Sequence, residues 1–265
     1  MTTSDSPPSS KDVKTVISIK AAQTSALIAR INRLLSTPQG IDRTLSLLYY
    51  LSTLVSPQLA RLAALTTIKL PTPVPLLVLT PTAEHLAVLS TRVKAVASKI
   101  SDVRMFLRLW GLFGMYAWAQ SHIAAPPTDR IVNYLVSAQI GVNTIYQILE
   151  NLAYLNGLNI VGFSKKTEGK MWIWSTRCWA AHIVLEFLRL ERVRYMRAKK
   201  RKRSGSKEDK EETVAWRKAW VSNAAYLPLS LHWSTEKGLI SDTAIGAFGV
   251  IASGIGFRET WRKTV

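Results

Sequence analysis

The sequence predicts an all-α protein, specifically a membrane-associated helical bundle with amphipathic surface helices and two hydrophobic helical hairpins. Three observations lead to this prediction. Apolar residues recur at the three-and-four spacing of α-helices through most of the chain. Long uncharged runs occur as two pairs, with a short polar turn inside each pair. Lys and Arg outnumber Asp and Glu by 35 to 17, and the net charge of +18 indicates an anionic lipid surface or nucleic acid as partner.

Composition excludes several classes of protein. With 265 residues, of which 48% are hydrophobic, the chain can bury a core and is not disordered as a whole. Cys178 is the only cysteine, so an intramolecular disulfide framework is excluded. The polar residues 1–10 contain no apolar segment of the kind found in secretory signals, and we expect them to be disordered. Together these features favour a reducing, cytosol-facing environment.

The N-terminal part, residues 11–110, is expected to form amphipathic helices. Residues 11–36 carry apolar positions at helical spacing, and Pro38 and Gly40 should end that helix. A second helix begins with the segment DRTLSLLYYLSTLV. The cluster of prolines that follows predicts an extended Pro-rich connector over residues 70–82.

From Glu84 onward the periodicity forms one continuous apolar stripe. Arg92 and Lys99 fall on one shoulder of this stripe, and Arg104 and Arg108 fall on the other. Basic side chains can lie along apolar surface while their charged ends reach a head-group layer, so we predict a membrane-inserting helix whose four cations contact anionic lipids. The alternative is a helix that packs on the core of a bundle. The stripe consists of Leu86, Leu89, Val93, Val96, Ile100, Val103, Leu107 and Trp110.

Four runs with at most one charged residue follow, and we interpret them as two hydrophobic hairpins, residues 111–150 and 214–265 including a basic tail. Each run is about as long as a helix that crosses a hydrocarbon layer of about 30 Å. Asn133, Gln139 and Asn143 make the second run better suited to the inside of a bundle than to lipid. The runs are residues 109–127, 131–149, 219–235 and 239–257.

The last run contains small residues four positions apart, a spacing that lets two helices approach closely in lipid. Gly249 and Ser253 form one such pair, and Ala252 and Gly256 form another. These four residues therefore predict a self-association surface and a homo-oligomer.

Residues 151–198, between the hairpins, are rich in Trp and Arg. Trp prefers the head-group level of membranes, so we predict an interfacial, surface-lying helix here. The apolar face of that helix would consist of Trp172, Trp179, Ile183, Phe187 and Leu190. The next segment, residues 199–213, reads as a basic and charged linker. Its KKRKR tract favours contact with lipid head groups, and a nuclear-localisation or nucleic-acid patch is the alternative.

Motifs for catalysis are missing from the sequence. It has no GxGxxG, P-loop or GxSxG pattern, and its histidines lack the spacing of metal ligands. We therefore expect no catalytic residues, no metal site and no cofactor, and the chain is not predicted to be an enzyme.

Several segments resemble one known family. QGIDRTLSLLYYL, SDVRMFLRLWG, ENLAYL and the block NAAYLPLSLHWSTEKGLISDTAIGAFGVIASGIGFRETW are similar to the peroxin-11 family of peroxisomal membrane proliferation proteins, and to its fungal C-type branch. The resemblance covers nearly the whole chain. Two departures are Tyr226, where relatives often have Asp before Leu-Pro, and the basic insert at residues 199–212.

The resemblance implies a protein that elongates the peroxisomal membrane before fission, through an amphipathic helix in the cytosolic leaflet. It also implies contacts with the import receptor for peroxisomal membrane proteins and with the fission machinery. Because the basic tracts lie on one side of the two hairpin turns, both termini should face the cytosol. The alternatives are a metabolite-conducting pore or pore regulator lined by Asn133, Gln139 and Asn143, and a basic nuclear nucleic-acid-binding protein.

Overall fold

Helices make up nearly all of the computed structural model, which describes residues 10–67, 80–204 and 209–264. Within these residues the chain forms eight α-helices and no strand, so the all-α prediction is confirmed. The helices are α1 (Ser10–Leu35), α2 (Pro38–Thr67), α3 (Thr80–Arg108), α4 (Gly111–Ala124), α5 (Arg130–Gly157), α6 (Lys165–Ser204), α7 (Lys210–Trp233) and α8 (Asp242–Arg262).

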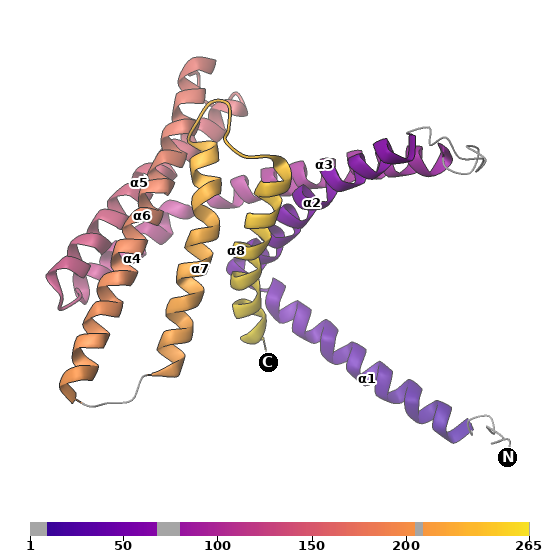
Figure 1. The fold of residues 1–265 in the computed structure, drawn as a ribbon, viewed down its shortest axis with the longest axis horizontal. Helices are drawn as coiled ribbons and strands as arrows, with labels where there is room; N and C mark the ends of the chain where they lie inside the picture. Colours follow the sequence, from indigo (N-terminus) through magenta and orange to yellow (C-terminus); the bar gives the residue numbers. More distant parts are fainter. Residues whose placement is uncertain (1–9, 68–79, 205–208, 265) are drawn as a thin grey trace.

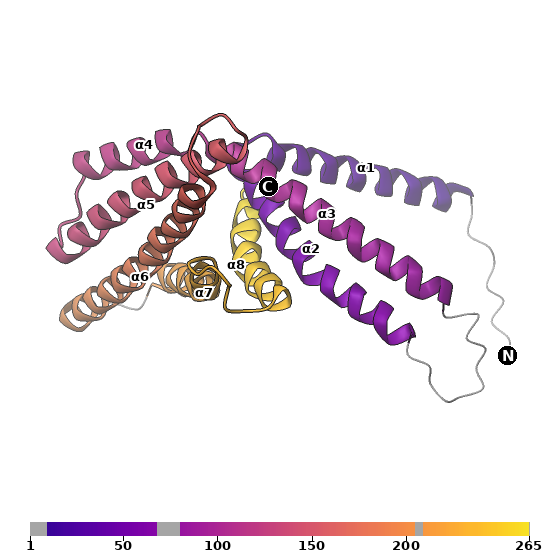
Figure 2. The same cartoon turned by 90° about the horizontal axis from the view of Figure 1, so that it is seen from above.

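The helices form two arms joined by the C-terminal pair. Helices α2 and α3 pack against each other and extend to one side, while α4, α5 and α6 extend to the other (Figure 2). Between the arms, α8 packs on α2, and α7 packs on both α6 and α8. Helix α1 projects away from the rest of the molecule (Figure 1).

Side-chain caps fix where three helices begin. Asp209 caps α7 and Ser241 caps α8, each by accepting backbone N–H groups of the first turn. Asp129 caps α5 by accepting from the Val132 N–H, and its carboxylate pairs with Arg192 of α6 at 2.7 Å. The Arg192 hydrogen bonds, followed by the Val132 N–H, lower the pKa of Asp129 to about 2. The start of α5 is thereby tied to α6.

The main core lies where α2, α6, α7 and α8 meet. Tyr50, Leu229 and Ile245 form its buried centre. Trp179 of α6 stacks on Trp233 of α7 with ring centroids 5.9 Å apart. Aromatic side chains from neighbouring helices therefore supply much of this core.

Arginines of α1 hold the C-terminal end of α8. Arg30 donates to the Trp261 carbonyl at 3.0 Å and to the Thr264 hydroxyl at 2.9 Å, and its guanidinium lies over the Trp261 ring. Arg33 donates to the Thr264 carbonyl at 2.8 Å. Since the last carbonyls of a helix lack partners within the helix, two cations at this end stabilise it and anchor α1.

Several expected boundaries differ from the structure. Helix α2 begins at Pro38 and continues past Pro57. It is therefore longer than the segment DRTLSLLYYLSTLV from which it was predicted. Helix α3 begins at Thr80 with Pro81 in its first turn, where the missing N–H of proline has no cost. The end of the predicted connector is therefore helical, and residues 68–79 lie outside the described residues.

Two further boundaries are corrected in the second half of the chain. Residues 151–157 complete α5 rather than opening the next helix. The KKRKR tract at residues 199–203 belongs to the end of α6 rather than to a linker, and α7 begins at Lys210.

The Trp-rich face of α6 packs against α7, whereas the sequence predicted that it lies on a membrane surface. Ile183 and Leu190 are buried. Trp179 contacts Tyr226 and Trp233 of α7, and Phe187 contacts Trp220 of α7. The face predicted for lipid thus packs inside the protein, because interior and interfacial helices have the same periodicity.

Over residues 10–67, 80–204 and 209–264, none of the helices combines the length and the apolar character needed to cross a membrane.

The small-residue face of α8 packs against α2 of the same chain. Ala252 and Ser253 are completely buried, and a Cβ added at Gly249 would overlap the ring of Tyr50. A Cβ added at Gly256 would lie 2.7 Å from the Arg43 guanidinium. The face predicted for self-association is therefore already covered, since small residues allow close approach within one chain as well as between chains.

Gly249→Ala is expected to destabilise the fold, because the new methyl group meets an aromatic ring in the buried contact of α8 with α2. Overpacking of this kind typically costs about 1–3 kcal/mol. Gly254→Ala is the matched control on the same helix, since among the described residues no atom outside the local backbone of α8 lies within 4 Å of the added Cβ. It should leave stability unchanged or raise it by up to about 1 kcal/mol through helix propensity. Urea unfolding followed by circular dichroism measures both variants, and equal midpoints would contradict the role of Gly249.

Candidate functional site

The apolar stripe of α3 divides into a packed edge and an exposed edge. Leu86, Val93 and Ile100 are half-buried on the side that carries the buried residues of α3. The other edge is open, with Val96 53% exposed and Trp110 61% exposed. Trp110 lies beyond the end of α3, where it precedes the first residue of α4. The exposed edge consists of Leu89, Val96, Val103, Leu107 and Trp110.

The four cations predicted to contact lipid fall into an exposed pair and an ion-paired pair. Arg92 and Lys99 are exposed, on the same side as the exposed edge. Arg104 instead donates through Nε to Asp42 of α2 at 2.9 Å, and Arg108 pairs with Glu150 of α5. Helix α3 packs on α2 through the opposite shoulder, so the arginines on that shoulder turn toward the protein.

Helix α4 continues the apolar surface. It has no Asp, Glu, Lys or Arg and no buried residue. Phe113, Tyr116 and Ile123 are among its exposed side chains, and Phe113 is 74% exposed. Figure 2 shows that α3 and α4 follow one another along the molecule. Exposed apolar patches of this kind usually mark an interaction surface. We name the exposed residues Val96, Val103, Phe106, Leu107, Trp110, Phe113, Tyr116 and Ile123 the α3–α4 surface.

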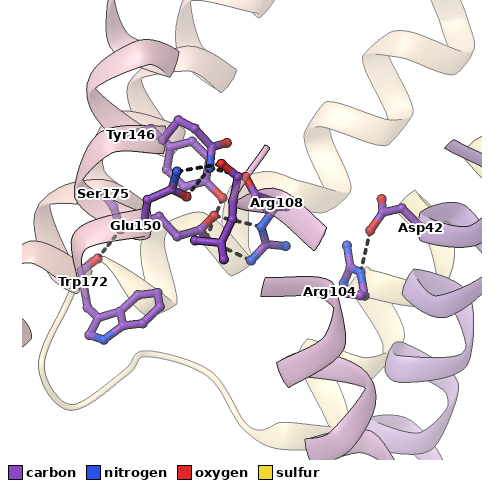
Figure 3. A network of polar contacts seen from close by, with 10 residues as sticks. Asp42, Arg104, Arg108, Tyr146, Glu150, Trp172 and Ser175 are labelled. Atoms are coloured by element: carbon purple, nitrogen blue, oxygen red, sulfur yellow. Dashed lines mark hydrogen bonds and ion pairs between the residues drawn. The ribbon is translucent and has the colours of Figure 1, made fainter. Parts of the chain in front are cut away.

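A polar network holds the end of α3 on α5 (Figure 3). Arg108 donates to both carboxylate oxygens of Glu150, at 2.8 and 2.9 Å, and the Tyr146 hydroxyl donates to Glu150 Oε1 at 2.8 Å. Burial favours the neutral form of Arg108, but Tyr146 and Glu150 outweigh this effect and raise the pKa of the guanidinium. Arg108 is therefore a permanent cation in a two-point ion pair.

The turn between α3 and α4 is fixed by the same segment of α5. Gln147 Nε2 donates to the Arg108 carbonyl at 2.8 Å, and Asn151 Nδ2 donates to the Leu109 carbonyl at 3.1 Å. These amides satisfy carbonyls at the end of α3 that lack helical partners. Gly111 lies so close to Gln147 that a side chain at that position would collide with it. The orientation of the α3–α4 surface thus depends on α5.

Sequence reasoning did not assign Glu150, Tyr146 or Asn151 to this network. One signal was available. Glu150 directly follows a run of 19 residues without charge, residues 131–149. A lone carboxylate after such a run needs a cation when it is buried, and Arg108 was a candidate partner.

Two of the three polar residues proposed to line a pore, Gln139 and Asn143, instead connect α5 to α6. Gln139 is buried and donates to Glu186 at 2.8 Å. Asn143 Nδ2 lies 2.7 Å from Nδ1 of His182. Burial lowers the pKa of His182, which favours the neutral ring in this contact. These contacts give the amides a structural role between two helices.

A cavity of about 560 Å³ lies where α2, α3, α5, α6 and α7 meet. Arg104, Arg108 and Glu150 supply its charged groups. Burial raises the pKa of the Tyr50 and Tyr146 hydroxyls, which therefore keep their protons. Its aromatic lining consists of Tyr49, Tyr50, Tyr146, Trp172, Trp179, Tyr226 and Trp233. Among the described residues, no group of His, Cys, Asp and Glu side chains is arranged to hold a metal ion.

The fold and surface define an all-α protein that exposes a long apolar surface oriented by a polar network. The profile of the family Peroxisomal biogenesis factor 11 (PEX11) matches residues 78–261, so the chain belongs to that family. The chain is also 30% identical over 159 residues to an uncharacterized protein of Schizosaccharomyces pombe, covering 60% of this chain and 71% of that protein. No solved structure matches it significantly.

Membership confirms the family indicated by the sequence motifs. It implies a role in peroxisome biogenesis and proliferation at the peroxisomal membrane, and this role is not enzymatic. Two motifs that carried the resemblance, SDVRMFLRLWG and ENLAYL, contain Arg108 and Glu150, so they contact each other in the fold.

Proposed function

We propose that this chain remodels and elongates the peroxisomal membrane before fission, and so controls peroxisome size and number, as a member of the fungal C-type branch of its family. The α3–α4 surface would enter the cytosolic leaflet. The observation that carries the proposal is the exposed apolar edge of α3 followed by α4, a helix with no charged residue of the Asp, Glu, Lys or Arg type and no buried residue.

Transfer of the exposed side chains into the leaflet supplies the driving force. Each fully buried Val, Leu or Phe contributes about 1.5–3 kcal/mol relative to water. Arg92 and Lys99 are exposed beside this edge and would reach the head groups, adding about 1 kcal/mol each on an anionic surface. Arg104 and Arg108 have no such role in the insertion of the α3–α4 surface, because they lie on the opposite shoulder of α3, where they turn toward the protein and pair with Asp42 and Glu150.

Insertion into one leaflet produces curvature, because the helices expand that leaflet relative to the other. Self-association would concentrate the inserted helices. Since the small-residue face of α8 is covered by α2, we place the contact between copies elsewhere, on the exposed apolar side of α1. Ile28 of α1 is 61% exposed there. Contacts with the import receptor and the fission machinery complete the proposal.

Production of the full chain with a tag at each end tests remodelling and topology together. Overproduction is expected to give elongated and then more numerous peroxisomes. Protease added to intact isolated peroxisomes should remove both tags, because the proposal places both termini in the cytosol. Peroxisomes of ordinary length would contradict remodelling, and a protected tag would contradict the topology.

A further inference from the structure

The aromatic cavity has no role in the proposed insertion of the α3–α4 surface, yet its size is that of a ligand site. Its volume of about 560 Å³ falls within the range of about 300–1,000 Å³ that is usual for small-molecule pockets. Residues of five helices line it, and it is open on one side to the surroundings of the protein. The ligand it fits can be inferred from the chemistry of its walls.

The walls are aromatic rather than aliphatic. No Leu, Ile or Val is among the described residues that line the cavity, and Met105 is its one aliphatic side chain there. A site for a hydrocarbon chain is expected to be lined by branched aliphatic residues. Walls of Trp and Tyr favour a ligand that uses the negative faces of the rings, of which quaternary ammonium groups are the best example.

Among the described residues, no arginine lies over an aromatic ring that lines the cavity. The arginines that lie over aromatic rings in the described chain do so elsewhere, over Trp174, Tyr195, Trp216 and Trp261. The ring of Trp179 contacts the rings of Trp233 and Tyr226. Trp172 also lines the cavity but is not part of this group of contacts. Trp172 is therefore the ring that we assign to a ligand cation, because it lines the cavity and lies against neither an arginine nor another aromatic ring among the described contacts.

The charged groups of the cavity suit a zwitterion. Arg104 and Arg108 are balanced by their partners Asp42 and Glu150, so the site as a whole has no net charge. This balance disfavours a polyanion such as a nucleotide. Arg104 donates one of the five N–H groups of its guanidinium to Asp42, and guanidinium groups recognise phosphate well. Figure 3 shows Trp172 on one side of the Arg108–Glu150 pair and Arg104 on the other.

We propose that this cavity binds a phosphocholine group, with the phosphate at Arg104 and the trimethylammonium against Trp172 near Glu150. The group can come from soluble phosphocholine or from the head of a choline phospholipid. The proposal does not depend on membrane insertion, because free phosphocholine in water tests it.

Calorimetric titration of the purified full chain in a choline-free detergent is the test. Phosphocholine is expected to bind saturably, and choline or inorganic phosphate alone should bind more weakly because each makes half of the contacts. Trp172→Leu keeps an apolar side chain but removes the ring, and should weaken phosphocholine binding roughly tenfold or more. Trp174→Leu is the matched control, two residues along α6 and outside the cavity, and should bind as the wild type does.

A second variant is needed because Trp172→Leu could lose binding through misfolding. Asp42→Asn combined with Arg104→Gln removes the phosphate contact without leaving an unpaired charge, and should also weaken phosphocholine binding. A soluble short-chain phosphatidylcholine distinguishes the sources, because binding tighter than that of phosphocholine assigns the site to lipid and weaker binding assigns it to the free group. Wild-type protein that does not bind phosphocholine, or Trp172→Leu binding at full affinity, would overturn the proposal.

Discussion

Val96→Glu combined with Val103→Glu is expected to abolish binding and tubulation of anionic vesicles by the full chain. Both side chains are exposed, at 53% and 46%, so the fold should tolerate the change. In the leaflet, however, the variant loses two apolar contacts of about 1.5–3 kcal/mol each and places two carboxylates in their position. Affinity for vesicles should fall more than about a hundredfold. Vesicle flotation and electron microscopy measure the two effects.

The control carries the same added charge on another side of the same helix. Thr91→Glu and Ser98→Glu have the same seven-residue separation, and both positions are exposed away from the α3–α4 surface. This variant should keep most of the vesicle binding, because its carboxylates stay in water. If both variants bind equally, the α3–α4 surface does not insert and general electrostatics accounts for the binding.

Arg108→Met is expected to lower the free energy of unfolding by about 3–5 kcal/mol. The side chain of Glu150 is only 8% exposed, and the variant leaves this buried carboxylate without its two-point partner. Since Arg108 also lies at the start of the turn into α4, loss of the pair should disturb the α3–α4 surface and weaken vesicle binding secondarily. Chemical unfolding of the purified full chain, followed by circular dichroism, measures the main effect.

Arg197→Met is the control for this prediction. It removes an Arg–Glu pair between α6 and α7 whose N–O distance is 3.0 Å but whose side chains are 39% and 54% exposed. Exposed pairs contribute at most about 1 kcal/mol, so the control should remain close to the wild type. The double variant Arg108→Met, Glu150→Leu should recover most of the loss, because it removes the buried charge as well. Equal destabilisation by both single variants would show that burial of the Arg108 pair is not what stabilises the fold.

The sequence predicted some features of the site correctly and left others undetermined. The apolar spacing from Leu86 to Trp110 predicted the helix and its stripe, because amphipathic periodicity is a local property. The spacing did not show which edge of the stripe contacts α2. For that reason Arg92 and Arg104 looked equivalent in the sequence, although Arg92 is exposed and Arg104 pairs with Asp42.

The same distinction applies to α6 and α8. Their apolar and small-residue faces were recognisable from spacing, but Trp179 packs on α7 and Gly249 packs on α2 rather than on lipid or on a second copy. A face that suits a partner helix in lipid also suits one within the chain, and periodicity does not distinguish the two.

The sequence by itself determined the all-α class, the order of the helices, the excess of basic residues and the family motifs, because each depends on residues close together in the chain. Only the tertiary structure decided which faces are covered, that Arg108 meets Glu150 beside an aromatic cavity, and that the α3–α4 surface stays exposed. The physical reason is that burial and ion pairing depend on contacts between residues distant in sequence. Those contacts form only when the helices pack.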